Sequence, residues 1–246
     1  MGQPTRLLVS DIDGTLLEDG RSTPGLETLR ALVDAHRPDI HLVYATGRTM
    51  ASIRELVEMD VLPRPDAVAA NVGTELWFAP FAEPDRRYHD HIAEGYRRDR
   101  ILDAAASFPE IRPQEAGAQS DVKASFYLED PDVVPRFEQL LERAEAGARV
   151  IYSCDRFLDA LPRRAGKRNA VEHLRRRLGI RPARVLVAGD SGNDIDMLAD
   201  PTFLAVAVGN AGEELAEIGA RPSEHQSQLP HAAGVLEGAE VFEFWT

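Results

Sequence analysis

Short apolar runs alternate with amphipathic stretches at both ends of the chain. The runs are short and rich in aliphatic residues, as in buried strands, and they cover 6–10, 40–45, 67–70, 185–188 and 204–208. The stretches between them repeat apolar residues at helical spacing, most clearly over 49–58 and 167–178. Thr23-Pro24 predicts the N-cap and first residue of a further helix. This alternation predicts an α/β fold with a doubly wound, mainly parallel sheet of the Rossmann-like type.

The middle of the chain has a different pattern. Pro80, Pro84 and a charged stretch follow the first group of strands and indicate an exit from that domain. Helical patterns cover 96–106 and 133–146, and runs at 123–128, 149–153 and 157–161 predict strands of an antiparallel sheet. We therefore expect a catalytic core domain of residues 1–81 and 160–246, and an inserted α+β domain of residues 82–159.

Composition narrows the function classes. The net charge of −13 argues against nucleic acid or an anionic membrane as a partner. No apolar stretch is long enough to span a bilayer, and the single cysteine, Cys154, cannot form an intramolecular disulfide. Together these features favour a soluble, cytoplasmic protein, and they leave its oligomeric state open.

Lysine is rare in this chain. The 28 basic residues include only two lysines, Lys123 and Lys167, and the rest are arginines. A compact ammonium group and a planar guanidinium group are not interchangeable where a point charge must fit. Both lysines are therefore candidate site residues, although an isolated lysine on a helix is usually a solvated charge.

Two acidic residues directly follow the first predicted strand, in the segment Asp11-Ile12-Asp13-Gly14-Thr15. Ligands of open α/β sheets bind at the carboxyl ends of the strands, and the chain leaves its strand here. Gly14 permits a sharp turn, so both carboxylates can face one pocket. A solvated acidic turn is the alternative interpretation.

Polar segments follow two other predicted strands. Thr46-Gly47-Arg48 follows the strand over 40–45. Thr46 offers a hydroxyl group, Gly47 lets a ligand approach the backbone closely, and the helix that starts next has an N-terminus that suits an anion. Asp190-Ser191-Gly192-Asn193-Asp194 follows the strand over 185–188, and its oxygen ligands suit Mg²⁺. A Ca²⁺ loop is a weaker interpretation, because the acidic residues that complete such a loop are missing.

These segments all lie at strand ends or helix starts, so folding would bring them together. They would supply a nucleophilic carboxylate, a second carboxylate, a hydroxyl group, an ammonium group and a metal-binding acid. That set is typical of phosphoryl transfer through an aspartyl-phosphate.

The four segments resemble, in chain order, the four motifs of the haloacid-dehalogenase superfamily, and the insert resembles its C2-type cap. The chain is most similar to the sucrose-phosphate phosphatase-like family within it. Five segments carry that similarity: 44–48, 71–75, 123–127, 152–153 and 209–211. Arg168 stands where the family usually has glycine, and the segment Ser153-Cys154-Asp155 departs from the family's usual Ser-Ser-Gly.

The resemblance implies a role for each matching residue. It makes Asp11 the nucleophile and Asp13 the general acid/base. It also implies three ligands of Mg²⁺: the Asp11 carboxylate, the backbone carbonyl of Asp13 and the Asp190 carboxylate. Phosphate-binding residues are then Thr46, Gly47, Lys167 and Asn193, and Asp194 supports the motif-four loop.

Substrate recognition is expected from the insert. Strand alternation places Lys123, Ser125 and Tyr127 on one face, which suits either a sugar or solvent. The resemblance adds Tyr152 and Ser153 to this set. The expected substrate is a phosphorylated sugar, with sucrose 6-phosphate or a related disaccharide phosphate as the candidates. A phosphomutase of the same fold and a non-catalytic phosphosugar-binding module are the alternatives.

Overall fold

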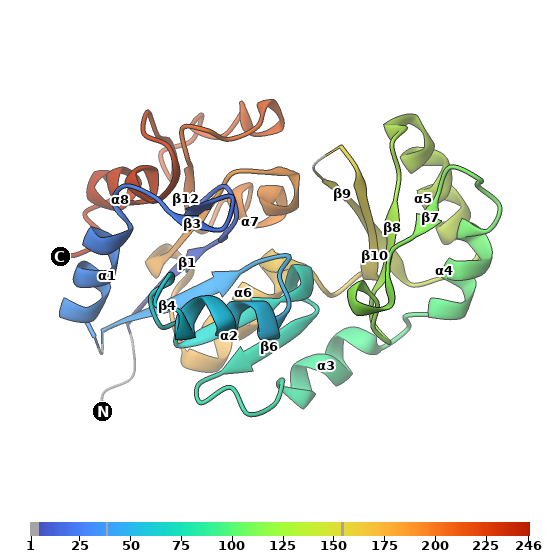
Figure 1. The fold of residues 1–246 in the computed structure, drawn as a ribbon, viewed down its shortest axis with the longest axis horizontal. Coiled ribbons are helices and arrows are strands. Elements are labelled where there is room, and N and C mark those ends of the chain that lie inside the picture. Colours follow the sequence, from blue (N-terminus) through green and yellow to red (C-terminus); the bar gives the residue numbers. More distant parts are fainter. Residues whose placement is uncertain (1–4, 38, 154) are drawn as a thin grey trace. The chain divides into compact units, whose positions relative to one another are not determined.

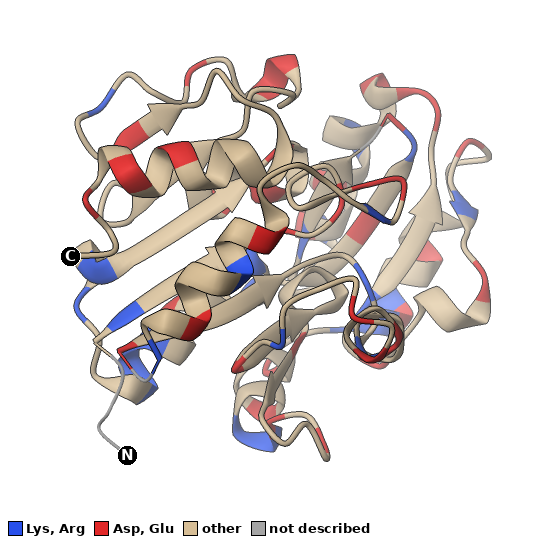
Figure 2. Cartoon of the chain, turned by 60° about the vertical axis from the view of Figure 1, so that its left-hand side comes forward, with Lys and Arg blue, Asp and Glu red and all other residues tan. Residues whose placement is uncertain are grey.

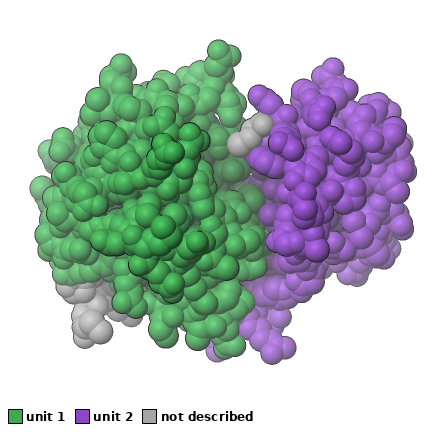
Figure 3. Space-filling model, viewed as in Figure 1, with its two compact units in different colours: residues 1–85, 167–246 green, residues 86–166 purple. Residues whose placement is uncertain are grey.

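The structure is a computed structural model, and it describes residues 5–37, 39–153 and 155–246. Cys154, which belongs to a predicted departure from the family pattern, lies outside the described residues. The chain forms two compact units, residues 1–85 with 167–246 and residues 86–166 (Figure 3). We call them unit 1 and unit 2.

Unit 1 is built on a seven-stranded sheet in the order β13-β12-β11-β1-β4-β5-β6. All its neighbouring strands are parallel except β6, which pairs antiparallel with β5. The strands are β1 (Arg6–Ser10), β4 (Ile40–Ala45), β5 (Ala67–Ala70), β6 (Glu75–Phe78), β11 (Val185–Gly189), β12 (Leu204–Ala207) and β13 (Glu224–Gln226). The predicted fold class is therefore confirmed for this unit.

Helices cover both faces of that sheet (Figure 1). Alternate strand residues such as Leu8 and Leu42 share a buried core with three helices, and the opposite face packs against two others. The first group comprises α1 (Leu26–Ala35), α2 (Met50–Glu58) and α8 (His231–Val241), and the second α6 (Lys167–Leu178) and α7 (Ile195–Leu198). Because both faces are covered, the strands consist of nearly continuous apolar residues.

The start of α1 differs from the prediction. Thr23 does not cap the helix, because its hydroxyl group donates to the carbonyl oxygen of Leu16 at 2.6 Å. Gly25 is the N-cap residue instead, with a φ of 92° that favours glycine. Thr23 thus closes the short hairpin of β2 (Leu17–Glu18) and β3 (Arg21–Ser22) that precedes the helix.

Unit 2 has an antiparallel sheet in the order β7-β8-β10-β9, with helices packed on one face. Phe126 and Leu158 point into that helix-covered core, so their strand neighbours lie on the other face. The elements are α3 (Arg86–Ala93), α4 (Arg98–Ala105), β7 (Arg112–Pro113), β8 (Ala124–Tyr127), α5 (Val134–Arg143), β9 (Ala148–Ser153) and β10 (Phe157–Pro162).

The unit boundaries lie later in the chain than the predicted domain limits at 81/82 and 159/160. Strand β10 pairs with β9 as far as Pro162, opposite Ala148, so a boundary at 159/160 would cut the sheet. At the other end, the Asp85 N–H donates to the carbonyl oxygen of Leu76 on β6, which keeps Asp85 with unit 1.

Acidic and basic residues are interspersed along the ribbon of both units (Figure 2). Among the described residues, none of the helices is long and apolar enough to cross a membrane.

Candidate active site

Asp11 lies directly beyond β1, at the carboxyl edge of the unit 1 sheet. Its backbone N–H donates to the carbonyl oxygen of Ala188 on β11 at 3.0 Å, and the residue is buried. The turn that follows approaches the next strand end closely. A Cβ atom on Gly14 would lie 2.1 Å from Asp190 Oδ2, and Thr15 donates to Asp190 Oδ1 at 2.7 Å. The loops after β1 and β11 are thus packed against each other.

Lys167 begins α6 and is fully buried between two carboxylates. Its Nζ lies 3.1 Å from Asp11 Oδ1 and 2.7 Å from Asp194 Oδ1. Burying an ammonium group is costly unless it is paired, and here two acids compensate for the lost solvation. The structure therefore excludes the interpretation of Lys167 as a solvated surface charge.

Asp194 holds the loop after β11 in place. Its Oδ2 accepts the N–H groups of Asp190 and Ser191 at 3.1 and 3.2 Å, and Oδ1 accepts Lys167. The Ser191 side chain accepts in turn from the Asp194 N–H, which completes a capping box. Both oxygens of Asp194 are thus occupied by hydrogen bonds within the protein.

The three clustered carboxyl groups, of Asp11, Asp190 and Asp194, disfavour one another's charge. Burial raises the pKa of Asp11, and the Lys167 charge opposes that rise. Burial and the neighbouring Asp11 charge raise the pKa of Asp190 to about 6. Although its own burial acts the other way, the Asp11 and Asp194 carboxylates raise the pKa of Lys167, so that this residue stays charged. One lysine does not balance three acids, and the cluster favours a further cation.

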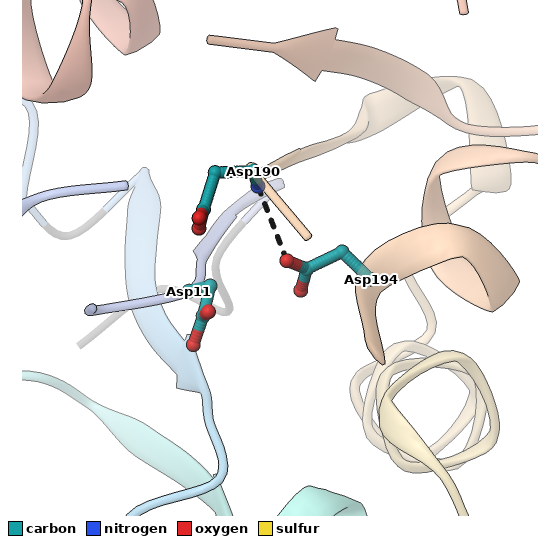
Figure 4. A group of neighbouring side chains, drawn as sticks. All are labelled: Asp11, Asp190 and Asp194. Atoms are coloured by element: carbon teal, nitrogen blue, oxygen red, sulfur yellow. Dashed lines mark hydrogen bonds between the residues drawn. The ribbon is translucent and has the colours of Figure 1, made fainter. Parts of the chain in front are cut away.

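A divalent cation fits this cluster. Oxygens of Asp11, Asp190 and Asp194 lie within 4.8 Å of one another, and Figure 4 shows the three side chains converging from the ends of β1 and β11 and the following turn. Because Asp194 is occupied, Asp11 and Asp190 are the carboxylates left to bind a metal. Asn193 Oδ1 is also buried without a hydrogen-bond partner among the described residues, so a further oxygen is available.

The predicted phosphate segment follows β4, the neighbour of β1 in the sheet. Thr46 is buried, and its Oγ1 accepts the Arg48 N–H at 3.2 Å. An added Cβ on Gly47 would meet no atom closer than 4.0 Å, so a ligand can approach the backbone there. Thr49 then caps α2. A buried hydroxyl group, an open backbone at Gly47 and the start of α2 thus lie together, and phosphate binding by this turn stays a prediction.

Arg48 binds Asp13, a contact that the sequence did not predict. Its Nε and Nη2 donate to the two carboxylate oxygens at 2.7 and 2.6 Å, and Nη1 donates to Ser52 at 2.8 Å. Arg48 belongs to the Thr46–Arg48 segment, and its place beside the phosphate turn was the available signal. The structure thereby links the second acid of the nucleophile loop to the phosphate segment.

In unit 2, Lys123 and Ser125 share a partner that sequence analysis missed. Ser125 donates to Asp159, and Lys123 Nζ lies 3.7 Å from the same carboxylate. Asp159 lies opposite Ser125 in the sheet, on the face away from the helices. The available signal was a single acid within the apolar run Phe157–Leu161.

The other predicted substrate residues lie on two different faces. Tyr127 is on the face of Ser125, where it donates to Glu115 at 2.8 Å, and Arg156 covers its ring at 4.9 Å. Ser153 pairs with Phe157 on that same face. Tyr152 packs instead against the helix-covered core and donates to the Leu128 carbonyl oxygen, because strand residues alternate between faces. Tyr152 therefore does not belong to the same surface as the others.

The comparison with known families decides the identity of the chain. A profile of the family described as sucrose-6F-phosphate phosphohydrolase matches residues 4–243. The chain belongs to this family.

Individual members of the phosphohydrolase family agree with that assignment. The mannosylfructose-phosphate phosphatase of Agrobacterium fabrum is 34% identical over 240 residues, covering 96% of both chains. The sucrose-phosphatase 1 of Nicotiana tabacum is 31% identical, and the match covers 96% of this chain but only 59% of the tobacco protein. The chain thus spans the length of the bacterial relative and about three fifths of the plant one.

Solved structures show the same architecture. The sucrose-phosphatase of Synechocystis, determined with sucrose and phosphate, superposes with a TM-score of 0.91 at 32% identity and covers 99% of this chain and 100% of that one. A subclass IIB sugar phosphatase of the haloacid-dehalogenase superfamily, only 19% identical, shares the fold with a TM-score of 0.69 and covers 98% of this chain. The predicted superfamily, fold class and phosphatase activity are therefore confirmed.

Proposed function

We propose that this phosphatase hydrolyses the phosphate ester of a fructose-containing disaccharide, through an aspartyl-phosphate on Asp11 and with Mg²⁺ as cofactor. The observation that carries the proposal is the burial of Asp11 beside Lys167 and Asp190. Asp11 can act as the nucleophile, Lys167 supplies a fixed ammonium group, and Asp190 supplies a carboxylate for the metal. The substrate class is supported by the sucrose- and mannosylfructose-phosphate phosphatases to which the chain is similar.

The reaction divides between the two acids of the nucleophile loop. Asp11 attacks phosphorus while the bond to the sugar oxygen breaks. For this step Asp13 carries a proton on an oxygen released from Arg48, and it gives that proton to the sugar oxygen. Asp13 then takes a proton from water as the water oxygen attacks the aspartyl-phosphate, which releases phosphate and restores the Asp11 carboxylate. Two easier steps thus replace one difficult step.

Positive charge is needed because a phosphoryl dianion and the Asp11 carboxylate repel each other. Lys167 supplies one fixed charge next to Asp11. Asp11, the Asp13 backbone carbonyl and Asp190 would hold Mg²⁺, and Asn193, next to Asp194 in the chain, offers a further buried oxygen. Bound Mg²⁺ would neutralise part of the phosphoryl charge. Thr46 and Gly47 would hold the remaining phosphoryl oxygens.

Sugar selection is assigned to the face of the unit 2 sheet that lies away from its helices, where Lys123, Ser125 and Asp159 are buried. Lys123, Ser125 and Asp159 combine an ammonium group, a hydroxyl group and a carboxylate, and these groups can pair with ring hydroxyls. Tyr127 and Ser153 lie further along the same face. Expectations of a cytoplasmic location and of no nucleic-acid or membrane partner stay predictions from the sequence.

The decisive experiment measures free phosphate released from a panel of sugar phosphates by the purified protein with Mg²⁺. We expect sucrose 6F-phosphate or mannosylfructose phosphate to exceed glucose 6-phosphate and fructose 6-phosphate in kcat/KM by at least ~10-fold. EDTA should abolish turnover, added Mg²⁺ should restore it, and Ca²⁺ should not, because its larger and more flexible shell does not suit in-line transfer.

The same assay separates hydrolysis from the phosphomutase alternative. A mutase would convert a hexose 1-phosphate to the 6-phosphate without releasing phosphate, whereas the proposed enzyme releases phosphate and forms no isomer. Monosaccharide phosphates hydrolysed faster than both disaccharide phosphates would contradict the substrate class and leave the phosphatase assignment intact.

A further inference from the structure

The carbonyl oxygen of Gly14 accepts hydrogen bonds from two residues of the C-terminal segment. Asn210 Nδ2 donates to it at 2.8 Å, and His231 Nδ1 donates to it at 2.8 Å. A carbonyl oxygen has two lone pairs, and both are used here. Gly14 follows Asp13 and precedes Thr15, so this carbonyl lies in the middle of the nucleophile loop.

The two donors also hold each other. The His231 N–H donates to Asn210 Oδ1 at 2.9 Å, so the Asn210 amide bridges the His231 backbone and the Gly14 carbonyl. This arrangement orients the amide, because only its NH₂ group can donate to Gly14. Asn210, His231 and Gly14 thus form a closed three-residue network, which we call the Gly14 lock.

His231 adopts an unfavourable backbone conformation within this network. Its φ of 51° lies in the left-handed region. A non-glycine residue adopts this conformation at an energetic cost, so it persists only where surrounding contacts hold it. His231 is the first residue of α8, and the side chain is largely buried, 13% exposed. The conformation aims Nδ1 at Gly14 while the backbone N–H reaches Asn210.

The rest of the nucleophile loop is also held by side chains from later segments. Lys167 lies beside Asp11, Arg48 binds Asp13, and Asp190 accepts from Thr15. Gly14 has no side chain, so its carbonyl oxygen is the group through which distant residues can hold it. The lock completes this series of contacts with residues that touch none of the reacting atoms.

We infer that Asn210 and His231 are positioning residues of the phosphatase, which fix the peptide group between Gly14 and Thr15 and so restrain the loop that carries Asp13 and Thr15. The inference rests on the proposed function for its catalytic consequence. Loss of either donor would free the Gly14 peptide to rotate. The Asp13 carboxyl group would then be within proton-transfer distance of the sugar oxygen less often. The phosphate-binding turn after β4 would be unaffected.

Paired substitutions test the lock. His231→Asn keeps a donor at the position of Nδ1, and asparagine also tolerates a positive φ. His231→Leu keeps comparable volume and removes the donor. Asn210→Asp keeps the acceptor for the His231 N–H and replaces the donor to Gly14 by an oxygen. His225→Leu is the control, because His225 binds Glu237 on α8 at 2.8 Å without contacting Gly14.

We expect His231→Leu and Asn210→Asp to lower kcat by at least ~10-fold with KM changed less than ~3-fold, and His231→Asn to stay within ~3-fold of the native enzyme. Hydrogen–deuterium exchange over residues 12–17 should accelerate in the first two variants and not in His231→Asn or His225→Leu. Equal behaviour of His231→Asn and His231→Leu in both measurements would overturn the inference.

The exchange measurement does not depend on turnover. If the native protein released no phosphate from any sugar phosphate, the proposed function would fail, and the exchange pattern alone would still decide whether the lock holds the loop. Faster exchange in all four variants would indicate general loosening of α8 and would also overturn the inference.

Discussion

Arg48 binds both carboxylate oxygens of Asp13, with Nε 2.7 Å from Oδ2 and Nη2 2.6 Å from Oδ1. The guanidinium plane matches the two oxygens, so the pair fixes the direction of the Asp13 side chain as well as its distance. Asp13 is half exposed, so the arginine, more than packing, restrains it.

Replacing Arg48 should therefore impair the step that needs Asp13. We expect Arg48→Ala to lower kcat by at least ~10-fold, about 1.4 kcal/mol of transition-state stabilisation. Arg48→Lys should recover only part of the loss, because an ammonium group cannot bind both carboxylate oxygens in the planar, bidentate geometry of a guanidinium group. Arg54→Ala is the matched control. Arg54 lies within α2, and its guanidinium group donates to the carbonyl oxygen of Phe81 and not to Asp13. Full activity of Arg48→Ala would show that Asp13 needs no such restraint.

Asp11→Asn should fold and lose phosphatase activity. The amide cannot form the acyl-phosphate, so we expect kcat to fall by at least ~1,000-fold, about 4 kcal/mol. Thermal unfolding should show an intact fold, because the substitution removes one of three crowded acidic charges. Asp19→Asn, in the neighbouring hairpin, should leave phosphate release unchanged, and retention of most of the native kcat by Asp11→Asn would refute the assigned nucleophile.

Lys167→Arg tests the need for a compact charge. The side chain is fully buried between Asp11 and Asp194, so a larger guanidinium group must displace one of them. We expect kcat/KM to fall by at least ~10-fold and the melting temperature to drop. Arg168→Lys, at the next and partly exposed position, is the control for exchanging the two basic residue types in α6. An unchanged rate in Lys167→Arg would mean that charge alone suffices at this position.

Stability should depend on both pH and Mg²⁺. The pKa of Asp190 rises from an ordinary 3.8 to about 6 in the folded, metal-free protein. Between those values the folded state binds a proton that the unfolded chain has released. The metal-free protein therefore loses stability as pH rises through this window. Mg²⁺ binds the ionised carboxylate, so its stabilising effect should grow over the same window.

The measurement compares melting temperatures with and without Mg²⁺ at about pH 5 and about pH 7.5. We expect a larger Mg²⁺-induced increase at the higher pH. Asp190→Asn should lose most of that increase and show a flatter pH dependence without metal. An equal Mg²⁺ effect at both pH values in the native protein would contradict the assignment of Asp190 as a ligand.

Replacing Lys123 should weaken binding of the sugar and leave the rate of phosphoryl transfer unchanged. We expect Lys123→Met to raise KM for the preferred sugar phosphate by at least ~10-fold and to change turnover of p-nitrophenyl phosphate by less than ~3-fold. Methionine is preferable to alanine because it fills the volume next to Asp159, which keeps its bond from Ser125. Equal losses on both substrates would place Lys123 in folding, and no loss on either would remove it from the sugar site.

The sequence by itself determined the α/β core and the places of the candidate site residues within it. Strands at 40–45 and 67–70 and the helix at 167–178 have the predicted limits, because continuous apolar runs and helical spacing are local signals. The places of Asp11, Thr46, Lys167 and Asp190 at strand ends or helix starts followed from the same signals.

Only the tertiary structure decided which side chains hold these residues. Thr23 bonds to Leu16 across a hairpin and does not cap α1, and Tyr152 faces the core of unit 2. Arg48 at Asp13, Asp159 at Lys123, and the pair Asn210 and His231 at Gly14 are contacts between separate segments. A hydrogen bond depends on distance and direction in three dimensions, and a local pattern of residue types records neither.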